Sequence, residues 1–178
     1  MKVRLLVCAV TSVALSSCAP AAPPAAPAAD IAAVTREITQ LETRWSGIAA
    51  AKDVAGFVAF YTDDAYVYLA GAPPMHGPAA IHAGLLPAMA DPNFSLHFET
   101  VRVQASAGGD LACSQGTYTE GGTDPATHRA ATTRGNYVTC WRRNAAGEWR
   151  AFVDITAVDP TAAAAPPPVA AVAAAAAR

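Results

Sequence analysis

Asp154 is the side chain whose surroundings best suit acid–base chemistry. It lies in the apolar segment Trp149–Val158, where the two-residue alternation of a strand places it on the same face as Phe152 and Thr156. If that face is shielded from water, the pKa of the carboxyl group is raised, as a general base requires. Asp154 is therefore our first candidate for a catalytic residue.

Two side chains could pair with Asp154. His97 would form a proton-transferring pair with it, and Arg134 would form an ion pair. The alternative is a structural aspartate held by backbone N–H groups or by an arginine, because ion-pair networks also perturb pKa values. The sequence leaves both interpretations open.

The remaining acidic residues and the histidines give weaker signals. Asp63 and Asp64 are adjacent, so in an extended segment they point to opposite faces, and a turn or helix cap explains them better. The histidines lack the spacing of paired metal ligands on a helix. They are His76, His82, His97 and His128. We expect neither a metal site nor a cofactor.

Aromatic residues are numerous enough to line a binding site as well as to fill a small core. They include Trp45, Tyr61, Tyr66, Tyr68, Tyr118, Tyr137 and Trp141. Most of them are expected in the core, which such side chains usually build. Tyr118, Tyr137 and Trp141 stand on strand-like segments near small residues such as Ser114 and Gly116, which favours a pocket wall.

Cys113 and Cys140 lie on two consecutive strand-like segments. If the hairpin between them is centred between Ala126 and Thr127, they are directly opposite and close enough for a disulfide. A slip of one residue in register would place them on opposite faces of the sheet. The disulfide is thus possible, and both registers stay open.

The elements that must position these residues divide into helices first and strands last. After Asp30, a favourable N-cap, apolar residues recur at spacings of three and four along one stripe. They are Ile31, Val34, Ile38, Leu41, Trp45 and Ile48. A short second helix follows Lys52 and Asp53, and a third begins at Gly77 and Pro78 and is ended by Pro87 and the Asp91–Pro92 pair.

The second half alternates apolar and polar residues between turns. After a short strand-like run at 65–69, four such segments follow each other. They are residues 94–107, 111–120, 132–143 and 148–158. Helices followed by an antiparallel meander predict one α+β domain over residues 30–160, in which a curved antiparallel sheet covers the long N-terminal helix.

The N-terminal residues have the features of an export signal. Lys2 and Arg4 precede an apolar run at 5–15 that is too short to span a bilayer. Residues 15–18, Leu-Ser-Ser-Cys, resemble the bacterial lipobox, in which the cysteine is acylated after cleavage. We therefore predict a signal peptide at 1–17 and lipidation of Cys18, with ordinary cleavage near the same position as the alternative.

Low-complexity segments flank the predicted domain. Residues 18–29 form an Ala/Pro linker and residues 161–178 a disordered Ala/Pro tail. The chain has 178 residues, and without the signal peptide 10 basic and 14 acidic residues remain, a formal charge of about −4. Because no basic cluster is present, nucleic acid is not expected as a partner.

Local sequence strings in this order resemble the NTF2-like superfamily and, within it, the SnoaL-like and DUF4440 group related to ketosteroid isomerases. They are Trp45 with Ala-Ala-Lys-Asp at 50–53, Phe-Tyr-Thr-Asp-Asp-Ala at 60–65, His-Gly-Pro-Ala-Ala-Ile at 76–81, and Trp-Arg-Arg at 141–143 with Gly-Glu-Trp at 147–149. The resemblance implies a cone in which the sheet wraps the long helix, an apolar pocket at its open end, and dimerisation through the sheet.

The resemblance also places the ketosteroid isomerase functional positions at Trp45, Leu69 and Thr139. Leu69 cannot abstract a proton and Trp45 cannot act as an acid at physiological pH, so isomerase activity is not expected. The Asp154 face of the last strand corresponds to the family's pocket wall. The expected pocket residues are Trp45, Leu69, Tyr118, Tyr137, Thr139, Trp141, Phe152 and Asp154.

We therefore expect an exported domain, lipid-anchored at the bacterial cell envelope facing the periplasm, that binds a small apolar or amphipathic molecule as a homodimer. Its contact with the membrane would be through the lipid anchor only. One alternative is a SnoaL-like enzyme, a cyclase, hydratase or lyase, with Asp154 and His97 as catalytic residues. Another is a structural or partner-binding envelope module with a filled cone.

Overall fold

The computed structural model describes residues 29–161. The predicted signal peptide, Cys18 and nearly all of the predicted linker and tail lie outside these residues. None of the helices in the described range is long and apolar enough to cross a membrane.

Three helices precede most of the sheet. Helix α1 spans Ile31–Ala50, and its N-cap Asp30 accepts a hydrogen bond from the Ala33 backbone N–H at 3.0 Å. Helix α2 is short, Val54–Val58, and α3 spans Gly77–Ala90. Pro87 lies inside α3 and does not end it, so the helix stops only at the Asp91–Pro92 pair.

The strands form one six-stranded sheet with the order β2-β1-β6-β5-β4-β3. Their bounds are Tyr61–Tyr68 for β1, Met75–His76 for β2, Ser95–Ala105 for β3, Leu111–Thr123 for β4, Ala130–Arg143 for β5 and Trp149–Val158 for β6. The four long strands form the predicted antiparallel meander. Strand β1 begins before the predicted run and pairs with β6 in parallel, aligning Val67 with Asp154.

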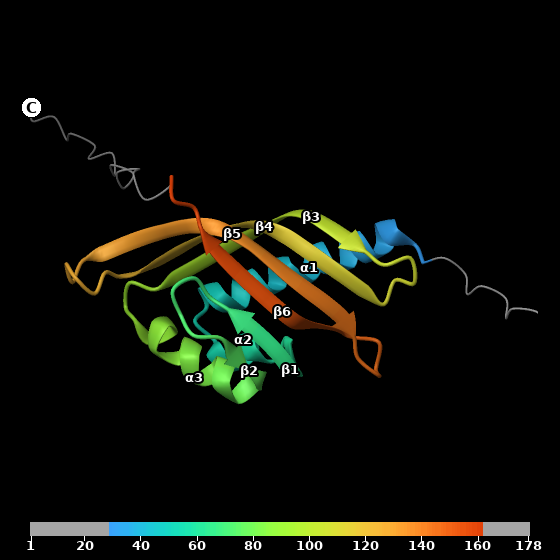
Figure 1. Ribbon diagram of the computed structural model, residues 1–178, viewed down its shortest axis with the longest axis horizontal. Coiled ribbons are helices and arrows are strands. Elements are labelled where there is room, and N and C mark those ends of the chain that lie inside the picture. Colours follow the sequence, from blue (N-terminus) through green and yellow to red (C-terminus); the bar gives the residue numbers. More distant parts are fainter. Residues whose placement is uncertain (1–28, 162–178) are drawn as a thin grey trace, which may run out of the picture.

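The sheet is curved, and α1 lies along its concave side (Figure 1). Helix α1 packs mainly against β3, whereas α3 packs against β1 and α2. The apolar stripe predicted for α1 faces this interior, where Val34, Ile38 and Trp45 are buried. The sheet and α1 therefore enclose the core between them.

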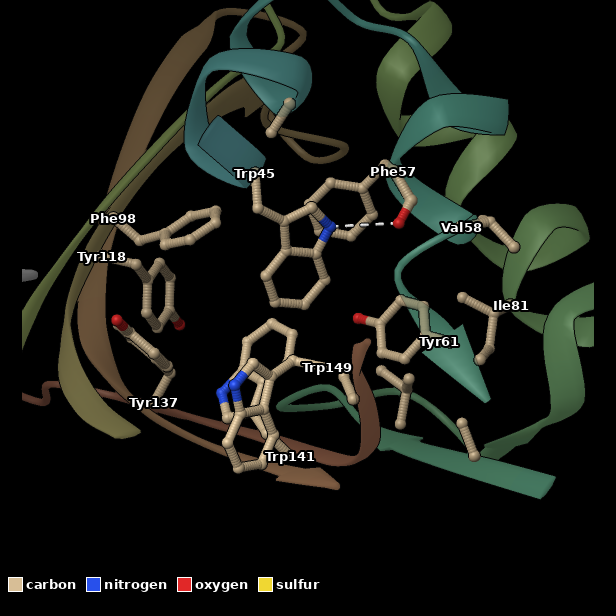
Figure 2. Packing of buried hydrophobic residues seen from close by; sticks show 14 of the residues in the cluster. Trp45, Phe57, Val58, Tyr61, Ile81, Phe98, Tyr118, Tyr137, Trp141 and Trp149 are labelled. Carbon is tan, nitrogen blue, oxygen red and sulfur yellow. Dashed lines mark hydrogen bonds between the residues drawn. The ribbon is translucent and has the colours of Figure 1, made fainter. Parts of the chain in front are cut away.

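Trp45 is the centre of that core, with only 2% of its surface exposed. Its ring stacks on Phe57 at 4.5 Å and meets the edges of Tyr61 and Trp141 at 5.3 Å each. Figure 2 shows these rings around Trp45, with its indole N–H donating to the Phe57 carbonyl oxygen at 3.0 Å. This buried bond satisfies the indole donor.

The β4–β5 hairpin adopts the register that sets Cys113 directly opposite Cys140. The two cysteines are joined in a disulfide. The alternative register, slipped by one residue, does not occur. The same register decides which side chains of these strands face α1.

Candidate functional site

Inward-facing side chains of β4, β5 and β6 form rows across the concave face. Row by row from the deepest, the paired residues are Ser114, Thr139 and Asp154; then Gly116, Tyr137 and Thr156; then Tyr118, Gly135 and Val158; and finally Glu120 and Thr133. Ser114 and Thr139 are almost completely buried, so this row is the floor. The rows lead from the floor toward the tip of the β4–β5 hairpin.

A pocket of about 460 Å³ lies over these rows. Its walls are mostly apolar, with aliphatic side chains from β1, β3 and α3 such as Val67, Leu96 and Leu85. Seven aromatic side chains complete the lining. They are Trp45, Phe57, Tyr61, Phe94, Phe98, Tyr118 and Tyr137.

Asp154 lies at the floor with 8% of its surface exposed. One carboxylate oxygen accepts a hydrogen bond from the Tyr61 hydroxyl at 2.7 Å, and the other accepts one from the Thr139 hydroxyl at 3.2 Å. Burial raises the pKa of Asp154 to about 6, against the lowering effect of these two hydrogen bonds. The carboxyl group therefore titrates near neutral pH.

The partners predicted for Asp154 lie elsewhere. His97 is held 3.4 Å from the Ser46 hydroxyl and 3.2 Å from a Glu99 carboxylate oxygen, and its side chain is mostly exposed. Arg134 lies between the inward-facing Thr133 and Gly135, so the alternation of the strand turns it to the outer face. The pair of Asp154 with His97 does not form, and Tyr61 occupies the partner's place.

Six of the eight expected pocket residues line the pocket: Trp45, Leu69, Tyr118, Tyr137, Thr139 and Asp154. Trp141 does not, because it is fully buried behind the floor, where its indole N–H donates to Ser114 at 2.9 Å. Phe152 does not either. The β5–β6 register shifts beside Trp141, so Phe152 leaves the Asp154 face and packs under the Arg142 guanidinium at 5.4 Å.

Glu42 on α1 is a functional candidate that the sequence reasoning missed. Its carboxylate is 1% exposed and accepts hydrogen bonds from the hydroxyl groups of Ser114, Thr100 and Tyr137, the last at 2.6 Å. Its position gave a signal, because Glu42 follows Ile38 by four residues on the buried stripe. A charged residue on such a stripe needs partners.

Glu42 also shapes the pocket wall through Tyr137. Burial and the charge of Glu42 raise the pKa of the Tyr137 hydroxyl group well above its ordinary value. Its proton is directed at Glu42, so the oxygen lone pairs of Tyr137 are left to accept from a bound molecule. Tyr61 is arranged likewise, with its proton directed at Asp154.

This arrangement can bind an apolar molecule and exchange a proton with it at the floor. A carboxyl group with a pKa of about 6 can both accept and donate a proton near neutral pH. Among the described residues, no group of three or more His, Cys, Asp or Glu side chains could hold a metal ion.

Comparison with known protein families decides the family. Residues 43–168 match the model of the SnoaL-like domain. The chain belongs to the SnoaL-like domain family. No curated protein matches the sequence significantly.

Solved structures similar to this SnoaL-like domain share the NTF2-like fold. A ketosteroid isomerase-like protein from Erwinia carotovora is 20% identical with a TM-score of 0.60, over 70% of this chain and 95% of that one. An NTF2-like superfamily protein from Salmonella enterica is 15% identical with a TM-score of 0.60, over 72% and 92% of the two chains. An NTF2-like protein from Pseudomonas putida is 26% identical with a TM-score of 0.56, over 71% and 87%.

The three positions expected from ketosteroid isomerases are all at the pocket of this SnoaL-like domain. Trp45, Leu69 and Thr139 line it, but none of them carries an acidic or phenolic group. Instead, the phenol of Tyr61 and the carboxyl group of Asp154 meet at the floor. The two side chains suited to acid–base chemistry therefore come from β1 and β6.

Proposed function

We propose that this SnoaL-like domain binds a small apolar or amphipathic molecule in its pocket. The observation that carries the proposal is the pocket of about 460 Å³ with its seven aromatic side chains. Pockets for small molecules are typically about 300 to 1,000 Å³, mostly apolar, with a few placed polar groups. Asp154, Tyr61 and Thr139 supply such groups at the floor.

Titration of the purified chain with decan-1-ol, followed by isothermal calorimetry, tests the proposal. We expect saturable binding that is weakened at least about tenfold in Leu69→Trp, because the larger ring fills the pocket. Leu111→Trp makes the same substitution at an exposed position outside the pocket and should leave binding unchanged. Equal binding by both variants, or no binding by the wild type, contradicts the proposal.

The second candidate function is catalysis by Asp154 in a cyclase, hydratase or lyase reaction. It is favoured by one observation, the buried carboxyl group with a raised pKa 2.7 Å from the Tyr61 hydroxyl. Ionised Asp154 would accept a proton from the bound molecule and return it at another atom. The rate should rise through a pH near 6 and be lost in Asp154→Asn while binding persists. Turnover by that variant would contradict this role.

Export, lipidation of Cys18 and homodimerisation belong to the same proposal. Export and lipidation rest on the N-terminal sequence, and homodimerisation rests on the sheet. A diacylglyceryl mass on Cys18, absent from Cys18→Ser, is the expected result of mass spectrometry on the chain purified from membranes. An unmodified, soluble mature chain contradicts it. The pocket is at odds with the alternative of a structural module whose cone is filled.

A further inference from the structure

The charged side chains of the pocket lining are all acidic. They are Glu120, Asp124 and Asp154, and no Lys, Arg or His of the described residues joins them in the lining. Asp154 is occupied by Tyr61 and Thr139. Asp124 caps its own turn, accepting from the backbone N–H groups of Ala126 and Thr127 at 2.8 Å each.. Glu120 alone of the three has no such partner.

Glu120 lies at the outer end of the rows on the concave face. It pairs in register with Leu96 on β3 and Thr133 on β5, and all three line the pocket. No hydrogen bond or ion pair within residues 29–161 involves its carboxylate. Burial raises the pKa of Glu120, with no opposing hydrogen bond or cation. A partly desolvated carboxylate without a partner gains strongly from an added positive charge.

Lys52 lies beside Phe94 of the pocket lining, but its ammonium group is committed elsewhere. The Lys52 ammonium donates to the Asp91 carbonyl oxygen at 2.7 Å and lies 5.9 Å from the Phe94 ring centre. Neither Lys52 nor His128 belongs to the lining, so neither neutralises Glu120 inside the pocket.

The distance from the mouth to the floor suits an elongated molecule. Glu120 is six positions along β4 from Ser114 in the floor row, which is roughly 20 Å along the strand. Tyr118, Phe98 and Tyr137 form an aromatic wall between the two ends. Aromatic faces attract cations as well as apolar groups, so this wall adds to the preference set by Glu120.

We propose that the pocket selects amphipathic amines, with a ligand ammonium group at Glu120 and an apolar chain or ring system extending toward Asp154. The inference rests on the proposed binding function and specifies its ligand class. Anionic amphipaths such as fatty acids are disfavoured, because every charged side chain of the lining is acidic. Neutral molecules of the same shape bind with intermediate affinity.

Three matched probes test the ligand class: decylammonium, decan-1-ol and decanoate, each titrated into the purified chain near neutral pH at concentrations where it is monomeric in solution. Calorimetry should show decylammonium binding at least about tenfold more tightly than decanoate, with decanol between them. Glu120→Gln should weaken decylammonium about tenfold and leave decanol within about twofold. Glu99→Gln removes the same charge from an exposed position outside the lining and should change none of the three.

A variant with the charge of residue 120 reversed is a second and more demanding test. Glu120→Lys should bind decanoate more tightly than decylammonium, while urea unfolding confirms that the domain is intact. Failure of all three probes to bind the wild type contradicts the binding function itself. Decanol binding without preference for decylammonium over decanoate overturns only the ligand class. A preference that survives in Glu120→Gln overturns the role of Glu120.

Discussion

Two buried carboxylates, Asp154 and Glu42, dominate the concave face at the scale of single residues. Glu42 is surrounded by three hydroxyl donors, whereas Asp154 has two and also faces the pocket. The charge of Glu42 adds to the burial that raises the pKa of Asp154. Glu42, behind the pocket wall, therefore helps through its charge to hold the proton on Asp154 at the floor.

The raised pKa of Asp154 predicts a specific dependence of stability on pH. The carboxyl group titrates near 3.8 in the unfolded chain and near 6 in the folded one, so both states are protonated only well below pH 3.8. As pH rises from about 4 to 6, the unfolded state ionises first, and the free energy of unfolding falls by about 3 kcal/mol in total. Above pH 6 this contribution is constant.

Asp154→Asn should remove that fall, because asparagine does not titrate. Urea unfolding of both proteins at about pH 4 and pH 7 measures this effect. The difference between their free energies of unfolding should change from one pH to the other. Asp91, Asp110 and Asp124 have lowered pKa values and give the opposite trend, but they are present in both proteins and cancel. A difference that does not vary with pH would show that Asp154 has an ordinary pKa.

The sequence placed Asp154 on the face that lines the pocket but did not reveal its hydrogen-bond partners. Alternation along one strand shows which residues share a face, so it placed Asp154 beside Thr156 correctly. It gives no information about Tyr61, which arrives from a distant segment, or about the β-bulge that removes Phe152 from that face. Glu42 could have been found from its place on the apolar stripe of α1.

At the scale of elements, two reciprocal pairs of tyrosine and glycine shape the wall formed by β4 and β5. Tyr118 is paired with Gly135, and Tyr137 is paired with Gly116. A Cβ atom on Gly135 would lie 2.2 Å from the Ala157 carbonyl oxygen and 2.5 Å from the Tyr118 ring. The missing side chains allow the tyrosine rings to lie close to the sheet and leave the pocket open.

Gly135→Ala should therefore destabilise the fold by about 2 to 3 kcal/mol, because the methyl group meets both a ring and the backbone. Gly47→Ala is the matched control. Gly47 is inside α1, and no atom lies within 4 Å of an added Cβ, so that variant should gain about 0.5 to 1 kcal/mol from helix propensity. Urea unfolding of the two variants measures both effects. Equal stabilities would contradict the close approach at Gly135.

The strands were easier to predict from the sequence than the way in which they pair. The four alternating segments predicted the meander, since neighbouring strands joined by short turns pair with each other. The parallel pairing of β1 with β6 has no such local signal, because residues 69–148 separate the two strands in the sequence. The sequence left two registers open for the cysteines, and only the pairing of the whole β4–β5 hairpin decides between them.

At the scale of the whole molecule, the outer face of the sheet carries an apolar strip across three strands. Tyr68 on β1, Ile155 on β6 and Val138 on β5 are consecutive partners in register, and each is about 40% exposed. Tyr66 stacks beside Tyr68 at 6.0 Å and widens the strip. Contiguous exposed apolar surface of this kind is typical of protein interfaces.

The strip predicts that the proposed homodimer forms through the outer face of the sheet. Sedimentation of the purified chain should show a dimer, and the double variant Val138→Asp with Ile155→Asp should be monomeric, because four charges would be buried in a twofold interface. Val101→Asp is the control, since Val101 is 74% exposed on β3, away from the strip. A monomeric wild type contradicts the interface. Because the pocket opens on the concave side, the monomeric variant should keep its affinity for decylammonium, which separates assembly from binding.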